Sequence, residues 1–175
     1  MGKITAPEPV TPIASVFTGD EALFTPVRAT LEERLGECIY TSSVLPFAET
    51  DYYAPEMGVG LERRIFAFAA LMDPGELAAL KRWTNELEAC FAEGGRRRVN
   101  IDSGYITQAK LVLATTKDQA HRLYVGQGIY AEVTLRFRAG RFEPWPWTYP
   151  DYASEPYRRI CEEIRALHRA KLHSK

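Results

Sequence analysis

The residue types best suited to chemistry are concentrated between Arg96 and Arg122, in the stretch RRRVNIDSGYITQAKLVLATTKDQAHR. Asn100 and Asp102 are two residues apart on an expected strand, so their side chains share one face of a sheet. The segments that follow carry further cations, a histidine and a second carboxylate: Lys110, Lys117, His121, Arg122, Glu132 and Arg136. If the strands are neighbours, these polar side chains converge and form a site.

Two kinds of chemistry suit such a set. The arginines and lysines could hold a phosphate group, while Asp102 and Glu132 could bind a divalent metal ion or act as acid and base. We therefore assign catalytic roles to Asp102, His121 and Glu132. Ligand-binding roles go to the other members, which are Asn100, Lys110, Lys117, Arg122 and Arg136. The alternative is a solvated sheet face with ordinary cross-strand ion pairs.

Some of these features allow a plainer interpretation. His121 is the only histidine outside the C-terminal helix, and it suits either a structural hydrogen bond or acid–base chemistry beside Lys117 and Asp118. Residues 50–53 (TDYY) and 148–152 (TYPDY) combine aspartate with tyrosines in expected loops. These loops could wall a pocket and stack on a base, or they could pack over the edge of the core.

Several well-defined catalytic and cofactor motifs are absent from the sequence. The segments Gly58–Gly60 and Gly126–Gly128 complete neither G-x-x-x-x-G-K-[ST] nor G-x-G-x-x-G. Neither G-x-S-x-G nor HExxH occurs. Cys38, Cys90 and Cys161 are far apart and form no CxxC pair, which favours reduced, buried thiols over disulfides or zinc.

The strands that must position the polar residues follow from hydrophobic periodicity. We expect them at residues 13–18, 38–47, 65–71, 98–102, 110–115, 123–125, 129–138 and 141–145. Alternation is clearest in 129–138, where Ala131, Val133, Leu135 and Phe137 alternate with polar residues. This pattern predicts a strand with one buried face and one polar face.

Helices are expected between these strands. The first begins at Asp20 or Thr25 and ends before Gly36. Asp73-Pro74-Gly75-Glu76 is a helix start signal, and Gly94-Gly95 ends that second helix. A last helix follows Ser154. Its inward residues are expected to be Tyr157, Ile160, Cys161, Ile164 and Leu167.

The element order is therefore β-α-β-β-α-β, followed by further strands and a helix. This order predicts an α+β fold with a ferredoxin-like βαββαβ core, an antiparallel sheet, extra C-terminal hairpin strands and a C-terminal helix. A chain of 175 residues suits one domain, which we place at 13–175 after a flexible N-terminal leader at 1–12.

Charge is distributed unevenly along the chain. Residues 1–95 hold 7 Lys and Arg against 15 Asp and Glu, a net charge of −8, whereas residues 96–175 hold 15 against 8, a net charge of +7. Such asymmetry can mark an anionic partner, or acidic and basic surfaces that meet in the fold or in a homodimer. No apolar run is long enough for a membrane span, and we expect a cytoplasmic protein with no membrane partner.

Five stretches identify a family resemblance: TDYYAPEMGVGLERR, RRRVNIDSGYIT, KLVLATTKDQAHR, GIYAEVTLRFR and PWTYPDY. They resemble the bacterial domain of unknown function 4416 family over about residues 13–167. Some members bear the label "GTP-binding protein". The segment Ala114–Asp118 is similar to the guanine-reading [NT]KxD motif, but Asp118 directly follows Lys117, without the spacer. The phosphate loop of small GTPases is also missing.

The leading functional hypothesis is a domain that binds or processes a small phosphate-bearing ligand, such as a nucleotide, with or without a divalent metal ion. A non-enzymatic interaction module or homodimer is the first alternative. An RNA-associated protein is the second, although the acidic N-terminal half and the lack of a recognised RNA module count against a nucleic-acid partner.

Overall fold

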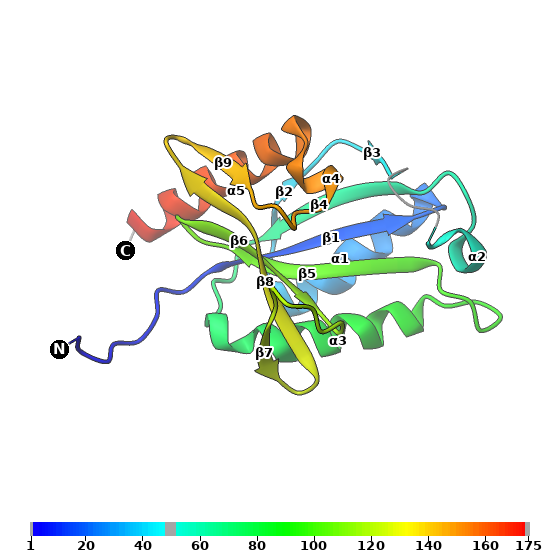
Figure 1. Ribbon diagram of the computed structural model, residues 1–175. Helices are drawn as coiled ribbons and strands as arrows, with labels where there is room; N and C mark the ends of the chain where they lie inside the picture. Colours follow the sequence, from blue (N-terminus) through cyan, green and yellow to red (C-terminus); the bar gives the residue numbers. More distant parts are fainter. Residues whose placement is uncertain (1, 48–51, 174–175) are drawn as a thin grey trace.

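The computed structural model describes residues 2–47 and 52–173, and within these ranges nine strands form one sheet in which all strand pairs are antiparallel (Figure 1). The order across the sheet is β2-β4-β1-β5-β6-β8-β7, with β3 also paired to β4 and β9 to β8. The strands are β1 (Thr11–Thr18), β2 (Cys38–Thr41), β3 (Leu45–Pro46), β4 (Glu62–Phe68), β5 (Val99–Ile106), β6 (Lys110–Thr115), β7 (Leu123–Gly126), β8 (Ile129–Arg138) and β9 (Arg141–Pro144).

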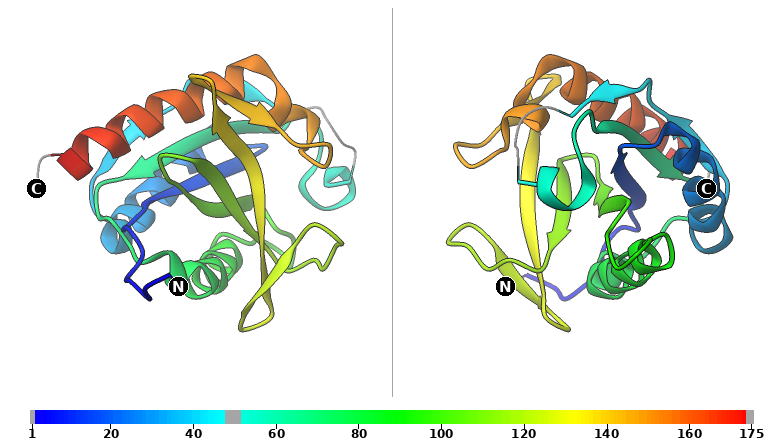
Figure 2. Two further views of the ribbon diagram at one scale, coloured as in Figure 1. Left: turned by 60° about the vertical axis from the view of Figure 1, so that its left-hand side comes forward. Right: turned by 90° about the vertical axis from the view of Figure 1, so that its right-hand side faces the viewer.

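Helices cover both faces of the sheet. Helices α1 (Phe24–Leu35) and α3 (Leu77–Cys90) pack on one face and share a core with alternate residues of β1, β4 and β5. Helices α4 (Pro150–Ala153) and α5 (Glu155–His173) lie on the opposite face, where they form a second core. In the left view of Figure 2, α5 runs along one side of the sheet, and α1 and α3 run along the other. The short helix α2 (Ala54–Met57) lies near the C-terminal end of β1.

Strand β1 is buried along its whole length because it is central in the sheet and has helices on both sides. It begins at Thr11, two residues before the expected start, and Val10 is already bridged to Met72. The segment 10–12, which we assigned to the leader, therefore contributes to the sheet. Burial on both faces also explains why IASVFT is a nearly continuous apolar run without alternation.

Several helix starts and strand bounds agree with the sequence signals. The carboxylates of Asp20 and Asp73 accept backbone N–H groups two residues on, as helix caps do, and each precedes a short 3₁₀ turn that leads into α1 or α3. Strands β6 and β8 have the expected bounds. The expected strand 38–47 is wrong in one respect, because it is divided into β2 and β3.

Two expectations about burial were also wrong. Leu167 is 36% exposed, whereas His168 is buried and lies 3.0 Å from the Thr11 hydroxyl, because α5 is rotated so that position 168 faces the sheet. Cys90 is exposed at the last residue of α3, so only Cys161 fully matches the expected buried thiols.

The alternation expected in β8 changes face midway. The register between β6 and β8 shifts by one residue, so that Leu111 lies opposite Leu135 but Val112 lies opposite Val133. This β-bulge places Val133 and Ala131 against α3, whereas Leu135 and Phe137 join the core beneath α5. The prediction of one buried face is therefore corrected: the apolar residues of β8 serve two cores.

The architecture as a whole is a mixed α/β fold with an antiparallel sheet. Across residues 2–47 and 52–173, none of the helices combines the length and apolarity that a membrane crossing requires.

Candidate functional site

The two predicted carboxylates lie on the same face of the sheet but do not touch. Glu132 in β8 lies opposite Leu113 in β6, which in turn lies opposite Gly104 in β5, two residues beyond Asp102. One strand therefore separates them, and with the two-residue offset along β5 their backbones are roughly 12 Å apart. In the described ranges no group of three or more His, Cys, Asp or Glu side chains is arranged to hold a metal ion. Asp102 and Glu132 thus belong to separate parts of the face.

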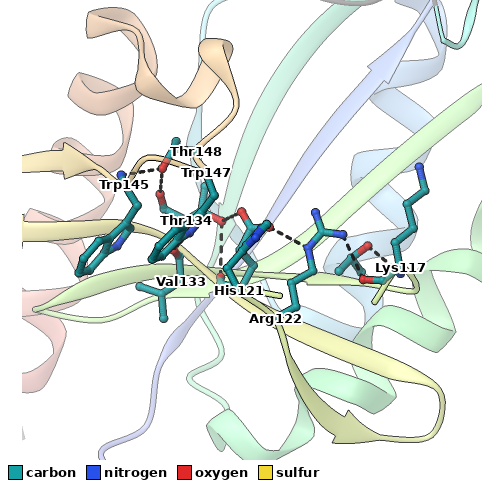
Figure 3. Close-up of polar contacts among 10 residues, drawn as sticks. Lys117, His121, Arg122, Val133, Thr134, Trp145, Trp147 and Thr148 are labelled. Carbon is teal, nitrogen blue, oxygen red and sulfur yellow. Dashed lines mark hydrogen bonds and ion pairs between the residues drawn. The ribbon is translucent and has the colours of Figure 1, made fainter. Parts of the chain in front are cut away.

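Glu132 is the centre of one polar cluster, whose members are drawn in Figure 3. Its Oε2 lies 3.0 Å from His121 Nε2 and accepts a 2.9 Å bond from Arg122 Nε. Its Oε1 accepts a bond from the Thr134 hydroxyl over 3.3 Å. Glu132 is only 4% exposed, and Arg122 is the cation that compensates its charge. Since both carboxylate oxygens have partners, Glu132 is placed to position His121 and Arg122 rather than to bind a ligand directly.

Arg122 also fixes the loop that follows β6. Its Nη1 donates to the main-chain carbonyl of Lys117 over 3.0 Å. In Figure 3 the Lys117 side chain extends away from Arg122, with its ammonium group at the end remote from the tryptophans. The loop is therefore anchored through its backbone while the lysine side chain remains exposed.

A stack of flat groups continues from His121 along β8. The imidazole stacks on Trp147 at 5.3 Å between centroids, Trp147 stacks on Trp145 at 5.0 Å, and the Arg136 guanidinium lies 4.5 Å from the Trp145 ring (Figure 3 shows the three rings). The Trp147 indole also donates to the Val133 carbonyl over 3.2 Å. Arg136 pairs with Glu143 at 3.3 Å. Arg136 therefore supports the stack, and it lies at a distance from Asp102.

Asp102 belongs to a second polar cluster. Its Oδ1 accepts from the Asn100 amide over 3.0 Å, as expected for two side chains on one face. Asn100 in turn accepts from Arg97 Nη1 over 2.9 Å, and Arg97 Nη2 donates to Glu56 over 2.7 Å. Within the described part of the chain, no cation lies at ion-pair distance from the half-buried Asp102 carboxylate.

Tyrosines from both predicted loops lie near Asp102. Burial, and next the negative charge of Asp102, raises the pKa of Tyr53 to about 12. The Tyr53 ring packs edge-on against Phe17 at 4.7 Å. Tyr152 in α4 is buried near the Ser15 hydroxyl. Burial raises the pKa of the Tyr152 phenol well above its usual range, and the Arg63 charge opposes the rise. Both loops therefore border the polar face, while Thr50 and Asp51 lie outside the described residues.

Sequence reasoning missed Arg63, whose side chain lies on this same face, because Arg63 is opposite Phe17 and Phe17 is opposite Asn100. It is 2% exposed, donates to Asp151 Oδ2 over 2.7 Å, and lies 4.3 Å from the Phe47 ring. Although burial opposes its charge, the pKa of Arg63 is raised because Tyr152, Asp102 and Asp151 face it. The sequence signal that could have identified Arg63 was an arginine on the strand 62–68 next to a buried run. An arginine that faces the core requires a partner for its charge.

The two predicted lysines lie at opposite ends of β6. Lys117, just beyond the strand, has its ammonium 4.4 Å from the Tyr52 ring centroid, and that ring contacts Tyr53. Lys110, the first residue of the strand, pairs in register with Arg136 and is exposed. The fold thus brings Lys117 to the side of the face that holds Asp102 and leaves Lys110 and Arg136 remote from it.

The comparisons with known proteins identify a family but no activity. A family model described as "Domain of unknown function (DUF4416)" matches residues 8–168. Neither the curated proteins nor the solved structures gave a match.

Proposed function

The chain belongs to this family, whose description carries no activity, and we propose from the geometry of the site that the protein binds a small phosphate-bearing ligand, such as a nucleotide, on the sheet face beside Asp102. Lys117 would hold the phosphate group. Asp102, oriented by Asn100, would accept hydrogen bonds from a hydroxyl or amine of the ligand. His121 would be the acid–base candidate, with Glu132 and Arg122 as positioning residues.

One observation carries this proposal. In the described part of the chain, Asp102 has no cation at ion-pair distance and Lys117 has no carboxylate at that distance, yet both lie beside the adjacent tyrosines Tyr52 and Tyr53. A carboxylate and an ammonium of this kind, next to the same aromatic wall, are available to a third molecule that carries both an anionic group and donor groups. A phosphorylated sugar or nucleotide has that combination.

A thermal-shift measurement against nucleotides, sugar phosphates and divalent metal ions tests this function. A ligand at about 100 times its Kd should stabilise the protein by about 2.7 kcal/mol, which for a domain of this size is on the order of 5–11 °C. The shift should be lost in Asp102→Asn and in Lys117→Ala. Lys110→Ala is the matched control, since that lysine lies at the far end of the same strand. A panel with no shift at saturating concentrations would exclude the proposal.

We also infer that β1, α1, β2, β4, α3 and β5 form a ferredoxin-like unit. In support, the spatial order β2-β4-β1-β5 is that of a split βαβ arrangement, its neighbours are antiparallel, and α1 and α3 cover one face. Strands β6 to β9 extend the sheet beyond β5; β8 supplies Glu132, and the loop between β6 and β7 supplies Lys117 and His121.

A protein-interaction role has one specific observation in its favour. Strand β7 is at the edge of the sheet and exposes Leu123 (74%) and Tyr124 (62%), and open apolar edges can pair with a second chain. An antiparallel homodimer through β7 would show a solution mass that rises with concentration, and Leu123→Lys would abolish that rise. A constant monomer mass up to high concentration would exclude it. An RNA partner has less support, because Arg97 and Arg98 are paired with Glu56 and Asp20 of the acidic half.

A further inference from the structure

A second polar site lies next to the start of β5. It is a cavity of about 360 Å³ that contains three consecutive arginines. Its lining residues are Thr18, Gly19, Asp20, Glu56, Met57, Val59, Glu93, Arg96, Arg97 and Arg98. The volume is within the usual range for small-molecule sites, which begins at about 300 Å³. We call it the arginine cavity.

Two of the arginines are held in place by carboxylates. Arg98 lies between Asp20, at 2.8 Å from Nη2, and Glu93, at 3.0 Å from Nη1. Arg97 is held by Glu56 at 2.7 Å and by Glu88 at 3.5 Å. These contacts fix the guanidinium groups at the cavity wall, so little side-chain entropy remains to be lost when a ligand binds there.

The arginine cavity has a surplus of hydrogen-bond donors. Each guanidinium has more N–H groups than the contacts above use, and Arg97 Nε is buried with no hydrogen-bond partner. Arg96 has no carboxylate at ion-pair distance in the described ranges. The lining carboxylates, in contrast, are already occupied by arginines. Such a surface suits an anion that accepts several hydrogen bonds, and it offers little to a cation.

One of the carboxylates can also leave at low cost. The Glu93 side chain is 75% exposed, and exposed ion pairs of this kind contribute little to stability. A phosphate oxygen that replaces Glu93 on Arg98 Nη1 would lie in the cavity that Arg96 also lines. Planar, two-point recognition of phosphate is the role for which arginine is better suited than lysine.

We propose that the arginine cavity is an anion site that takes the phosphate group of a small molecule through Arg96 and Arg98. This inference goes beyond the ligand site at Asp102, because it requires neither Asp102 nor Lys117. The two sites are connected by the hydrogen-bonded series Glu56–Arg97–Asn100–Asp102.

Calorimetric titration with inorganic phosphate and with pyrophosphate, in a buffer of fixed ionic strength, tests the proposal. Arg96→Gln breaks no ion pair of the described structure and should weaken binding about tenfold, and the double variant with Arg98→Gln should weaken it more. Arg138→Gln is the control, since Arg138 is exposed at the turn between β8 and β9. Circular dichroism and the melting temperature establish that each variant is folded.

The outcomes separate the two sites. Phosphate binding that survives in Asp102→Asn and Lys117→Ala but is lost in Arg96→Gln supports the arginine cavity, whatever happens to the ligand at Asp102. Phosphate binding that is equal in the wild type, Arg96→Gln and the double variant would overturn it. Absence of any saturable binding of either anion to the wild type would overturn it as well.

Discussion

Arg63 donates from Nη1 to Oδ2 of Asp151 over 2.7 Å, and the two side chains are only 3% and 8% exposed. The first residue belongs to β4 and the second to α4, so this ion pair attaches the segment after β9 to the sheet. It does so on the face that carries Asp102, and it fixes the position of Tyr152, which follows Asp151 in α4.

Removal of one partner should therefore be costly. Asp151→Asn removes the hydrogen-bonded counter-charge of the buried Arg63, and we expect a loss of about 3–5 kcal/mol in the free energy of unfolding. Urea denaturation measures this loss. Asp118→Asn is the control, because Asp118 is exposed, and it should change stability by less than about 0.5 kcal/mol. Equal effects of the two substitutions would contradict the structural role of the pair.

Gly104 is required by a close backbone approach. A Cβ atom at this position would lie 2.2 Å from the Val112 carbonyl oxygen in β6. Gly104→Ala must therefore separate β5 from β6, at a cost of about 1–3 kcal/mol or more. Gly19→Ala is the matched control, since its Cβ would make an ordinary 3.5 Å contact with the Met57 carbonyl. The denaturation midpoints of Gly104→Ala and Gly19→Ala, measured side by side, test whether the close approach at Gly104 makes the first variant the less stable one.

His168 should make stability depend on pH. Burial lowers the pKa of its imidazole from the ordinary 6.5, so the unfolded chain binds a proton more readily than the folded protein. The contribution of the neutral imidazole is complete above pH 6.5 and is lost as the pH falls toward the lower folded pKa. His168→Gln should flatten this acid-side decline, measured by melting temperatures between pH 7 and 5. The exposed His173→Gln should retain the wild-type decline.

The cysteines should differ strongly in reactivity. Burial raises the pKa of the Cys161 thiol to about 12, so at pH 8 almost no thiolate is present there and access is blocked. Cys90 is exposed at the end of α3. With iodoacetamide at pH 8, we expect mass spectrometry of the native protein to show labelling at Cys90 and none at Cys161. Labelling of both at similar rates would contradict the burial of α5 against the sheet.

The sequence predicted the parts of the fold that depend on local signals. The bounds of β6 and β8 and the cap at Asp73 were correct, and Asp20 was one of two starts considered for the first helix, because periodicity and capping are encoded within a few residues. The buried ion pair of Arg63 and Asp151 was not predicted. Its two residues are 88 positions apart, and only the packing of α4 on the sheet makes them partners.

The same limit applies to the candidate site. The contacts of Glu132 with His121 and Arg122 connect a strand to the loop just before its hairpin partner, so proximity along the chain made their convergence predictable. The separation of Lys110 and Arg136 from that cluster depends on strand register, which places them at the far end of β6 and β8. Register is set by long-range packing, and the bulge in β8 alters it further.

That bulge has a consequence for how one strand can serve two purposes. With uninterrupted alternation, the side of β8 that carries Glu132 would continue through Thr134, Arg136 and Arg138, and it would be hydrophilic from end to end. The one-residue offset inverts the phase after Val133, so the same side continues instead with Leu135 and Phe137, on which α5 packs. β8 thereby combines a polar half, which is available for recognition, with an apolar half that anchors a helix. Without the extra residue position, that is with all residues kept and an uninterrupted register, Leu135 and Phe137 would turn away from α5 and the helix would lose its apolar contact with β8.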